Sequence, residues 1–138
     1  MNVQPYLMFD GRCEEALEFY RQALGAEILM TMRFGEMPGP CEPGMIPPGS
    51  ENKIMHSSFR VGDATLMASD GNCKDQIKFS DGITLTLTVK DVADAERRFA
   101  ALADGGRVQT PLTKTFFSPS FGQVADRFGV SWMVYVAP

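Results

Sequence analysis

The sequence predicts an α+β fold of two tandem βαβββ modules, which build an open mixed sheet with both helices on its outer side. The prediction depends on an internal repeat. The strand-like stretches VQPYLMF (Val3 to Phe9) and ITLTLTV (Ile83 to Val89) are each followed by a helical pattern. Gly25 and Gly105 end the two helical patterns, at the same spacing that separates Val3 from Ile83. A repeated βαβββ unit has to build a shared sheet from two half-sheets, because each half needs its helix to cover one face.

The chain has the length and composition of one globular domain. Its 138 residues suffice to bury a core, so we expect a single domain over residues 1–138. Module one should span about residues 1–70 and module two about residues 82–138. Hydrophobic residues make up 44% and charged residues 22% of the chain, which is usual for a globular protein.

Charge and cysteine usage exclude several classes of partner. A net charge of −4 argues against nucleic acid, because phosphates require a basic surface. No apolar run reaches the roughly 18 residues of a membrane span, and no signal pattern opens the chain, so neither membrane nor export is expected. Cys13, Cys41 and Cys73 are scattered and odd in number, which favours free thiols in the cytoplasm over a disulfide framework.

Module one reads as a strand, a helix and three strands. Helical spacing of apolar residues predicts a helix over Glu14 to Leu24, which Gly25 ends in a left-handed conformation. Alternation and turn residues predict the strands at Val3 to Phe9, Ala26 to Phe34, Ile54 to Arg60 and Ala64 to Ser69. Asp70 follows the last strand, and turn capping is its expected role.

Module two repeats this order. Asp91 is expected to cap a helix over Val92 to Ala103, with Asp94 three residues on. Strands are predicted at Ile83 to Val89, Arg107 to Thr113, Phe121 to Arg127 and Ser131 to Val136. Alternation places Trp132 on the helix side and Tyr135 on the opposite side, and Asp126 should cap the turn between the last two strands.

The segment from Gly35 to Asn52 separates the second and third strands of module one. It is rich in Pro, Gly and Met and has no apolar period, which predicts a long loop. Two alternatives stay open for this loop: it folds over the mouth of a binding site, or it lies across a dimer partner.

Three stretches of the chain resemble a known family. PYLMFDGRCEEALEFYRQALGAE, MHSSFRVGDATLMASD and DRFGVSWMVYV are similar to the PhnB-like branch of the vicinal oxygen chelate superfamily. This superfamily contains glyoxalases, extradiol dioxygenases and bleomycin- or fosfomycin-resistance proteins. Members of the branch are also labelled 3-demethylubiquinone 3-methyltransferase-like domains. The resemblance covers nearly the whole chain and implies a cup-shaped site and a homodimer, with modules that pair either within or between chains. It implies no settled reaction.

The resemblance also implies a metal held at four quasi-symmetric points by His and carboxylate ligands. Registering the first strands places Gln4 and Thr84 at the first ligand position of each module. Registering the final hairpins through Gly62 and Gly129 places Leu66 and Met133 at the closing positions. None of these side chains is a suitable ligand for a divalent first-row metal, so neither a metal nor another cofactor is expected.

His56 is the only histidine, and it has the same repeat offset from Gln123 as the final hairpins have from each other. A lone histidine on a strand is more often structural, but here the repeat directs it at the cup, where imidazole can act as hydrogen-bond partner or base. The nine methionines either form an adaptable pocket or fill gaps in the core, the commoner role. The residues expected to contact a ligand are Gln4, Tyr6, Met8, His56, Thr84, Thr86, Thr88, Gln123, Met133 and Tyr135.

These residues favour a protein that binds a small organic molecule in the cup without the usual metal. The alternative is a lyase, isomerase or transferase-type enzyme that uses His56 as base or an atypical metal site. Methyl transfer is disfavoured, because S-adenosylmethionine is normally held by a glycine-rich turn in a parallel α/β sheet, and no GxG follows either first strand. The sequence does not identify the ligand.

Overall fold

The structure is a computed structural model that describes residues 1–36, 49–71, 78–79 and 82–138. The chain divides into two compact units, Met1–Ile77 and Lys78–Pro138, which are described separately. Each unit is a βαβββ module with a four-stranded mixed sheet, so the predicted α+β fold of two modules is confirmed. Most of the predicted loop over residues 35–52, with both of its proposed roles, lies outside the described residues, as do Cys41 and Cys73.

Unit 1 has the sheet order β1-β4-β3-β2, in which β1 and β4 are parallel and the other pairs antiparallel. Its first strand is shorter than predicted and begins at Tyr6, directly after Pro5, which has no N–H to donate and accepts a hydrogen bond from Met67 N through its carbonyl. Its elements are β1 (Tyr6–Met8), α1 (Cys13–Leu24), β2 (Glu27–Arg33), the 3-10 turn η1 (Phe34–Glu36), β3 (Ile54–Val61) and β4 (Ala64–Ser69).

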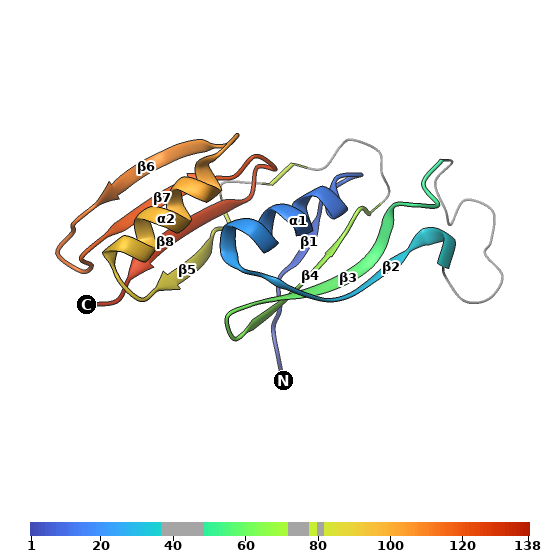
Figure 1. Ribbon diagram of the computed structural model, residues 1–138, viewed down its shortest axis with the longest axis horizontal. Helices are drawn as coiled ribbons and strands as arrows, with labels where there is room; N and C mark the ends of the chain where they lie inside the picture. The colour runs from blue at the N-terminus through green and yellow to red at the C-terminus, as the bar shows by residue number, and fades with distance from the viewer. Residues whose placement is uncertain (37–48, 72–77, 80–81) are drawn as a thin grey trace. The chain divides into compact units, whose positions relative to one another are not determined.

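Helix α1 lies across one face of the unit 1 sheet (Figure 1). Tyr20 of α1 is fully buried and stacks on Phe59 of β3, with ring centroids 5.9 Å apart. Gly25 ends the helix with φ 68°, as predicted, and its N–H donates to the carbonyl of Arg21. The side chains that alternate with Phe59 therefore point to the opposite face, which we call the open face of the unit.

Unit 2 repeats the order as β5-β8-β7-β6, with β5 and β8 parallel. Helix α2 again covers one face (Figure 1), and a Cβ on Gly122 of β7 would come within 2.9 Å of the Phe99 ring. Asp91 caps α2 as predicted, by accepting a 2.7 Å hydrogen bond from the Asp94 N–H. The elements are β5 (Leu85–Val89), α2 (Val92–Ala103), β6 (Arg107–Thr113), β7 (Phe121–Ala125) and β8 (Ser131–Val136).

The two helices have twelve residues each. Among the residues that the structure describes, neither helix has the length or the apolar run that crossing a bilayer requires.

Candidate functional site

The open face of unit 1 carries a hydrogen-bonded pair of polar aromatic side chains. Tyr6 Oη lies 2.9 Å from His56 Nδ1, and the two ring centroids are 5.6 Å apart with a tilt of 36°. Tyr6 comes from the edge strand β1 and His56 from β3, with β4 between them. Two residues that are distant in sequence therefore meet on one side of the sheet, because the parallel β1–β4 pair places β1 beside the β3–β4 hairpin.

The Tyr6 phenol keeps its proton more strongly than a free tyrosine does. Partial burial raises the pKa of its phenol above the ordinary value, a hydrogen bond from Ser69 acts in the opposite direction, and the charge on Cys13 adds a smaller rise. A phenol that keeps its proton can donate it to His56 Nδ1, and the imidazole then carries its own proton on Nε2. In this tautomer, His56 presents a donor to any molecule that lies on the open face.

Methionine side chains surround this pair. Tyr6 lies opposite Met67, Met67 opposite Ser58, and Ser58 opposite Met30, which makes one row across all four strands. Directly opposed residues in a sheet point to the same face. Met8, which the sequence also predicted at the site, is two residues beyond Tyr6 on β1 and so points to this face as well. Gln4 lies before the first residue of β1 and is half-buried.

The open face of unit 2 carries a connected cluster of amides and hydroxyls. Gln123 Nε2 donates to Ser131 Oγ at 3.0 Å and lies 3.4 Å from Thr84 Oγ1. Thr84 Oγ1 donates to Ser131 Oγ at 3.1 Å, and Ser131 Oγ donates to Gln109 Oε1 at 3.2 Å. The sequence predicted Gln123 and Thr84 at this face but missed Ser131 and Gln109. The parallel pairing of β5 with β8 was the missing signal, because it sets Thr84 beside Ser131.

The other residues predicted at this face lie in the next two rows of the sheet. Thr86 is opposite Met133, and Thr88 is opposite Tyr135. Tyr135 stacks on Phe117 with ring centroids 6.4 Å apart. Trp132 is 3% exposed and faces the helix side, so the predicted alternation along β8 is confirmed.

The predicted equivalence of His56 and Gln123 is wrong. Ser58 lies opposite Met67, and Gln123 lies opposite Met133. Each of these methionines also lies opposite a residue of the first strand of its unit. The counterpart of Gln123 is therefore Ser58. The error arises from the turns, because two residues separate the paired ends Val61 and Ala64, whereas the turn from Ala125 to Ser131 is longer. Alignment through Gly62 and Gly129 consequently displaces β3 by two residues, which leaves His56 on the open face, and β4 by one residue, which exchanges its faces.

The one-residue displacement of β4 corrects the position assigned to Leu66. Leu66 lies opposite Phe59, and both are buried on the helix side, so Leu66 does not face the site. The corrected set of metal positions is Gln4, Thr84, Met67 and Met133, and an amide, a hydroxyl and thioethers do not suit the divalent metals of the superfamily. Within the described ranges, no group of three or more His, Cys, Asp or Glu side chains lies close enough to hold a metal ion.

Among the described residues, the methyl donor implied by the methyltransferase label also has no fitting site. Only one strand pair in each sheet is parallel, so neither unit contains the parallel sheet on which a glycine-rich turn holds S-adenosylmethionine. At the start of the helix that follows β1, the N–H groups of Gly11 and Cys13 are already bonded. Asp70 Oδ1 accepts hydrogen bonds from Gly11 N at 2.8 Å and Cys13 N at 2.7 Å.

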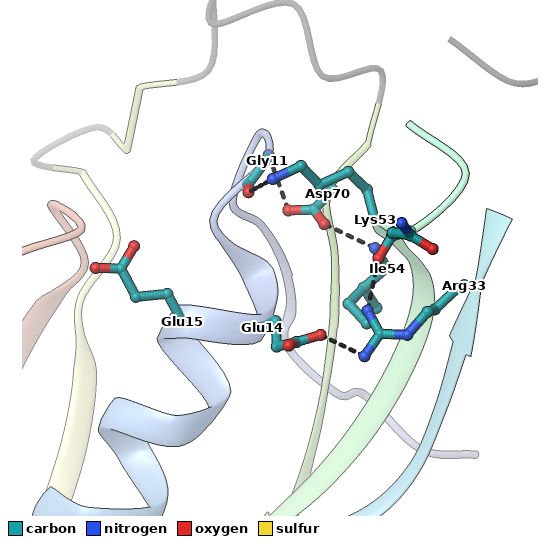
Figure 2. Close-up of a pocket in the computed structure, with 8 residues that line it drawn as sticks. Gly11, Glu14, Glu15, Arg33, Lys53, Ile54 and Asp70 are labelled. Carbon is teal, nitrogen blue, oxygen red and sulfur yellow. Dashed lines mark hydrogen bonds and ion pairs between the residues drawn. The ribbon is translucent and has the colours of Figure 1, made fainter. Parts of the chain in front are cut away.

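Asp70 closes one wall of a pocket of about 480 Å³ beside the first turn of α1 (Figure 2). Its polar groups bind each other: Lys53 Nζ donates to Gly11 O at 2.8 Å, while Arg33 pairs with Glu14 at 2.5 Å and donates to the Asn52 carbonyl at 2.6 Å. These contacts join α1 to β2 and β3. We therefore assign the pocket a structural role, which the sequence did not predict.

Two of the buried aspartates, Asp70 and Asp126, have different roles. Asp126 was expected to cap a turn, and this is confirmed, because Oδ1 accepts hydrogen bonds from the N–H groups of Phe128 and Val130. Its Oδ2 also accepts a bond from Trp132 Nε1 at 2.9 Å. Asp70 instead reaches across to the start of α1 and to Ile54 N, so it anchors a helix and a strand that are far apart in the sequence.

Comparisons with known proteins agree with this fold. The family model described as 3-demethylubiquinone-9 3-methyltransferase matches residues 1–135. The crystal structure of protein PA1353 from Pseudomonas aeruginosa is 41% identical, with a TM-score of 0.85 over 99% of this chain and 98% of that one. A PhnB protein from Bacillus cereus, named as a candidate 3-demethylubiquinone-9 3-methyltransferase, is 28% identical, with a TM-score of 0.82 over 99% of this chain and 100% of that one.

A more distant structure shows the same fold. The glyoxylase/bleomycin resistance protein/dioxygenase domain from Frankia is 14% identical, with a TM-score of 0.69 over 100% of this chain and 98% of that one. The family model covers nearly the whole chain, and both modules have the predicted strand order. The chain therefore belongs to the PhnB-like 3-demethylubiquinone-9 3-methyltransferase family and has the glyoxalase/bleomycin-resistance fold.

Proposed function

We propose that the protein binds a small, partly apolar organic molecule on the open face of unit 1, with the Tyr6–His56 pair as its polar contact. The observation that carries the proposal is the 2.9 Å hydrogen bond between these two side chains. It fixes the imidazole on a face that also carries the side chains of Met8, Met30, Met32 and Met67 and is only partly covered. One oriented polar group among apolar side chains is the usual composition of a site for a small ligand.

The open face of unit 2 supports the same kind of function. Gln123, Thr84 and Ser131 form a ready set of donors and acceptors, and Thr86 and Thr88 are exposed beside them. Met133 and Tyr135 are half-buried and add apolar surface. We propose that this face offers contacts of the same kind to a small organic molecule, without a metal or another cofactor. We also propose that the protein acts as a homodimer in the cytoplasm.

Binding fits the site better than methyl transfer does. The side chains on both open faces offer hydrogen bonds and apolar contact, whereas a methyl donor would need a site that neither sheet provides. In this proposal the family name indicates common descent only, and the function is inferred from the residues of the site.

A thermal-shift screen of metabolites and antibiotics tests the proposal. We expect hits that raise the melting temperature of the wild type and lose most of this effect in His56→Ala. The control is Asp63→Asn, on an exposed turn away from the Tyr6–His56 pair. Binding that persists unchanged in the double variant His56→Ala, Gln123→Ala would place the ligand elsewhere. Each hit is then tested for turnover. If the wild type forms product and His56→Ala binds the hit without forming product, the protein is an enzyme and the proposal of binding alone is wrong.

A further inference from the structure

None of the methionines in the described ranges is fully buried. The buried apolar side chains of the described residues include Leu, Phe, Val, Ile, Trp and Tyr, but no methionine. The sequence favoured a gap-filling role in the core for most of the nine methionines, and for the described ones this is wrong. Their positions therefore need a different explanation.

Four methionines share the open face of unit 1 with the Tyr6–His56 pair. Met30 and Met67 lie in the same row as Tyr6, and Met32 lies directly opposite His56. Met8 is the next residue of β1 on the same face. The four thioethers come from three different strands, so they cover the surface on both sides of the pair.

This surface is partly exposed to water. Met8 is 40% and Met30 39% exposed, and Tyr6 is 40% exposed. The free energy falls when a molecule covers apolar side chains that lie together on one exposed face. Methionine is flexible and polarizable, and its sulfur makes favourable contacts with aromatic rings. A face of several thioethers thus prefers a flat aromatic occupant to a saturated one of equal size.

The polar pair adds a second requirement. When Tyr6 donates to Nδ1, the neutral imidazole of His56 has its proton on Nε2 and can donate it to a ligand. A ligand that satisfies this donor needs an acceptor atom at the edge of its ring. We propose that the open face of unit 1 binds planar aromatic molecules that carry an acceptor oxygen, such as an aryl ketone or lactone. This inference rests on the proposed function and names the class of its ligand.

The test uses matched pairs of probe molecules and the methionines as reporters. Protein with ¹³C-labelled methionine methyl groups is titrated with coumarin, a flat aromatic lactone, and with octahydrocoumarin, its saturated counterpart. Single Met→Leu substitutions assign the methyl signals. We expect coumarin to bind about tenfold more tightly, because several sulfur–aromatic contacts add together. We also expect the ring to shift the methyl signals of Met8, Met30, Met32 and Met67 upfield.

Two variants separate the components of the proposal. Met67→Leu keeps the volume and removes the sulfur, so the preference for coumarin should fall several-fold while octahydrocoumarin is unaffected. His56→Phe keeps a ring and removes the donor, so it should weaken both lactones alike. Equal affinity of the two lactones for the wild type would overturn the aromatic class and leave the proposed function standing. Coumarin binding without upfield shifts of these methyl signals would also overturn it. Hits of the wider screen that leave all four methyl signals and His56 unmoved would overturn the proposed function itself.

Discussion

At the scale of single residues, two buried carboxylates organise the turns and helix ends of the protein. Asp70 is 1% exposed and accepts hydrogen bonds from the N–H groups of Gly11, Cys13 and Ile54. A negative charge at the start of α1 also interacts favourably with the helix dipole. The sequence could predict a cap for this aspartate from its place after a strand, but not the partner, because the partner depends on the tertiary fold.

We expect Asp70→Asn to lower the free energy of unfolding by about 3 kcal/mol, because an amide offers one acceptor oxygen where the carboxylate offers two. Its NH₂ group would also face N–H donors. Urea denaturation measures the change, and Asp63→Asn is the matched control, since exposed Asp63 should alter stability by less than about 0.5 kcal/mol. An unchanged midpoint for Asp70→Asn would refute the anchoring role.

Cys13 makes stability depend on pH in alkaline solution. Burial, with the nearby charge of Asp70, raises the pKa of its thiol from the ordinary 9.0 to about 12. Above pH 9 the unfolded chain loses this proton while the native protein keeps it, so the stability present below pH 9 is lost as the pH rises toward 12. One such proton lowers the free energy of unfolding by up to about 1.4 kcal/mol per pH unit.

Urea denaturation from pH 9 to about pH 11 should therefore show a steeper loss of stability for the wild type than for Cys13→Ala. The comparison uses the slopes, since Cys13→Ala also leaves a small cavity that shifts stability at every pH. Equal slopes would mean that the buried thiol does not titrate as described.

At the scale of secondary structure elements, both helices and most strand boundaries could be predicted from the sequence. The pattern of apolar residues gives Val92–Ala103 as the structure has it, because helical spacing and the Asp91 cap agree. The counterpart of Gln123 in unit 1, Ser58, could not be predicted. It depends on the number of residues in each hairpin turn, and both turns contain a glycine that suggests the same alignment. Strand pairing therefore located the site residues where spacing along the chain did not.

The connection from α2 to β6 requires a glycine for steric reasons. A Cβ on Gly106 would lie 2.2 Å from the carbonyl oxygen of Ala125, which is backbone and cannot move aside alone. We expect Gly106→Ala to cost about 3 kcal/mol of stability, as overpacking does. Gly62→Ala is the control: it has φ 57° and no atom within 4 Å of the added Cβ, so strain alone should cost about 1 kcal/mol. Chemical denaturation measures the loss of stability in both variants. Similar losses in Gly106→Ala and Gly62→Ala would contradict the close approach of Gly106 to the Ala125 carbonyl.

At the scale of the whole molecule, the repeat gives both units the same strand order but different open faces. Unit 1 offers thioethers around one polar aromatic pair, while unit 2 offers a cluster of amides and hydroxyls. The fold class could be predicted because the repeat and the glycines of its turns can be recognised in the sequence. The unequal chemistry of the two faces follows from register, which only the paired strands define.

Edge strands give a reason to expect a homodimer. β2 lies at an edge of the unit 1 sheet, and Leu29 and Met30 on it are exposed. Exposed apolar edges are normally covered by another chain or element. Light scattering at micromolar concentration should give the mass of two 15.2 kDa chains. A monomer mass at the same concentration would refute the homodimer.

The imidazole of His56 provides the most direct measurement of the central claim, that a small molecule binds at the Tyr6–His56 pair. Because the chain has one histidine, a long-range ¹H–¹⁵N spectrum contains one set of imidazole signals and needs no assignment. We predict that the spectrum of the free protein shows an acceptor at Nδ1 and a proton on Nε2. Saturation with the best hit of the screen should then shift the Nε2 signal. A hit that stabilises the protein and leaves both nitrogen signals in place would contradict the claim.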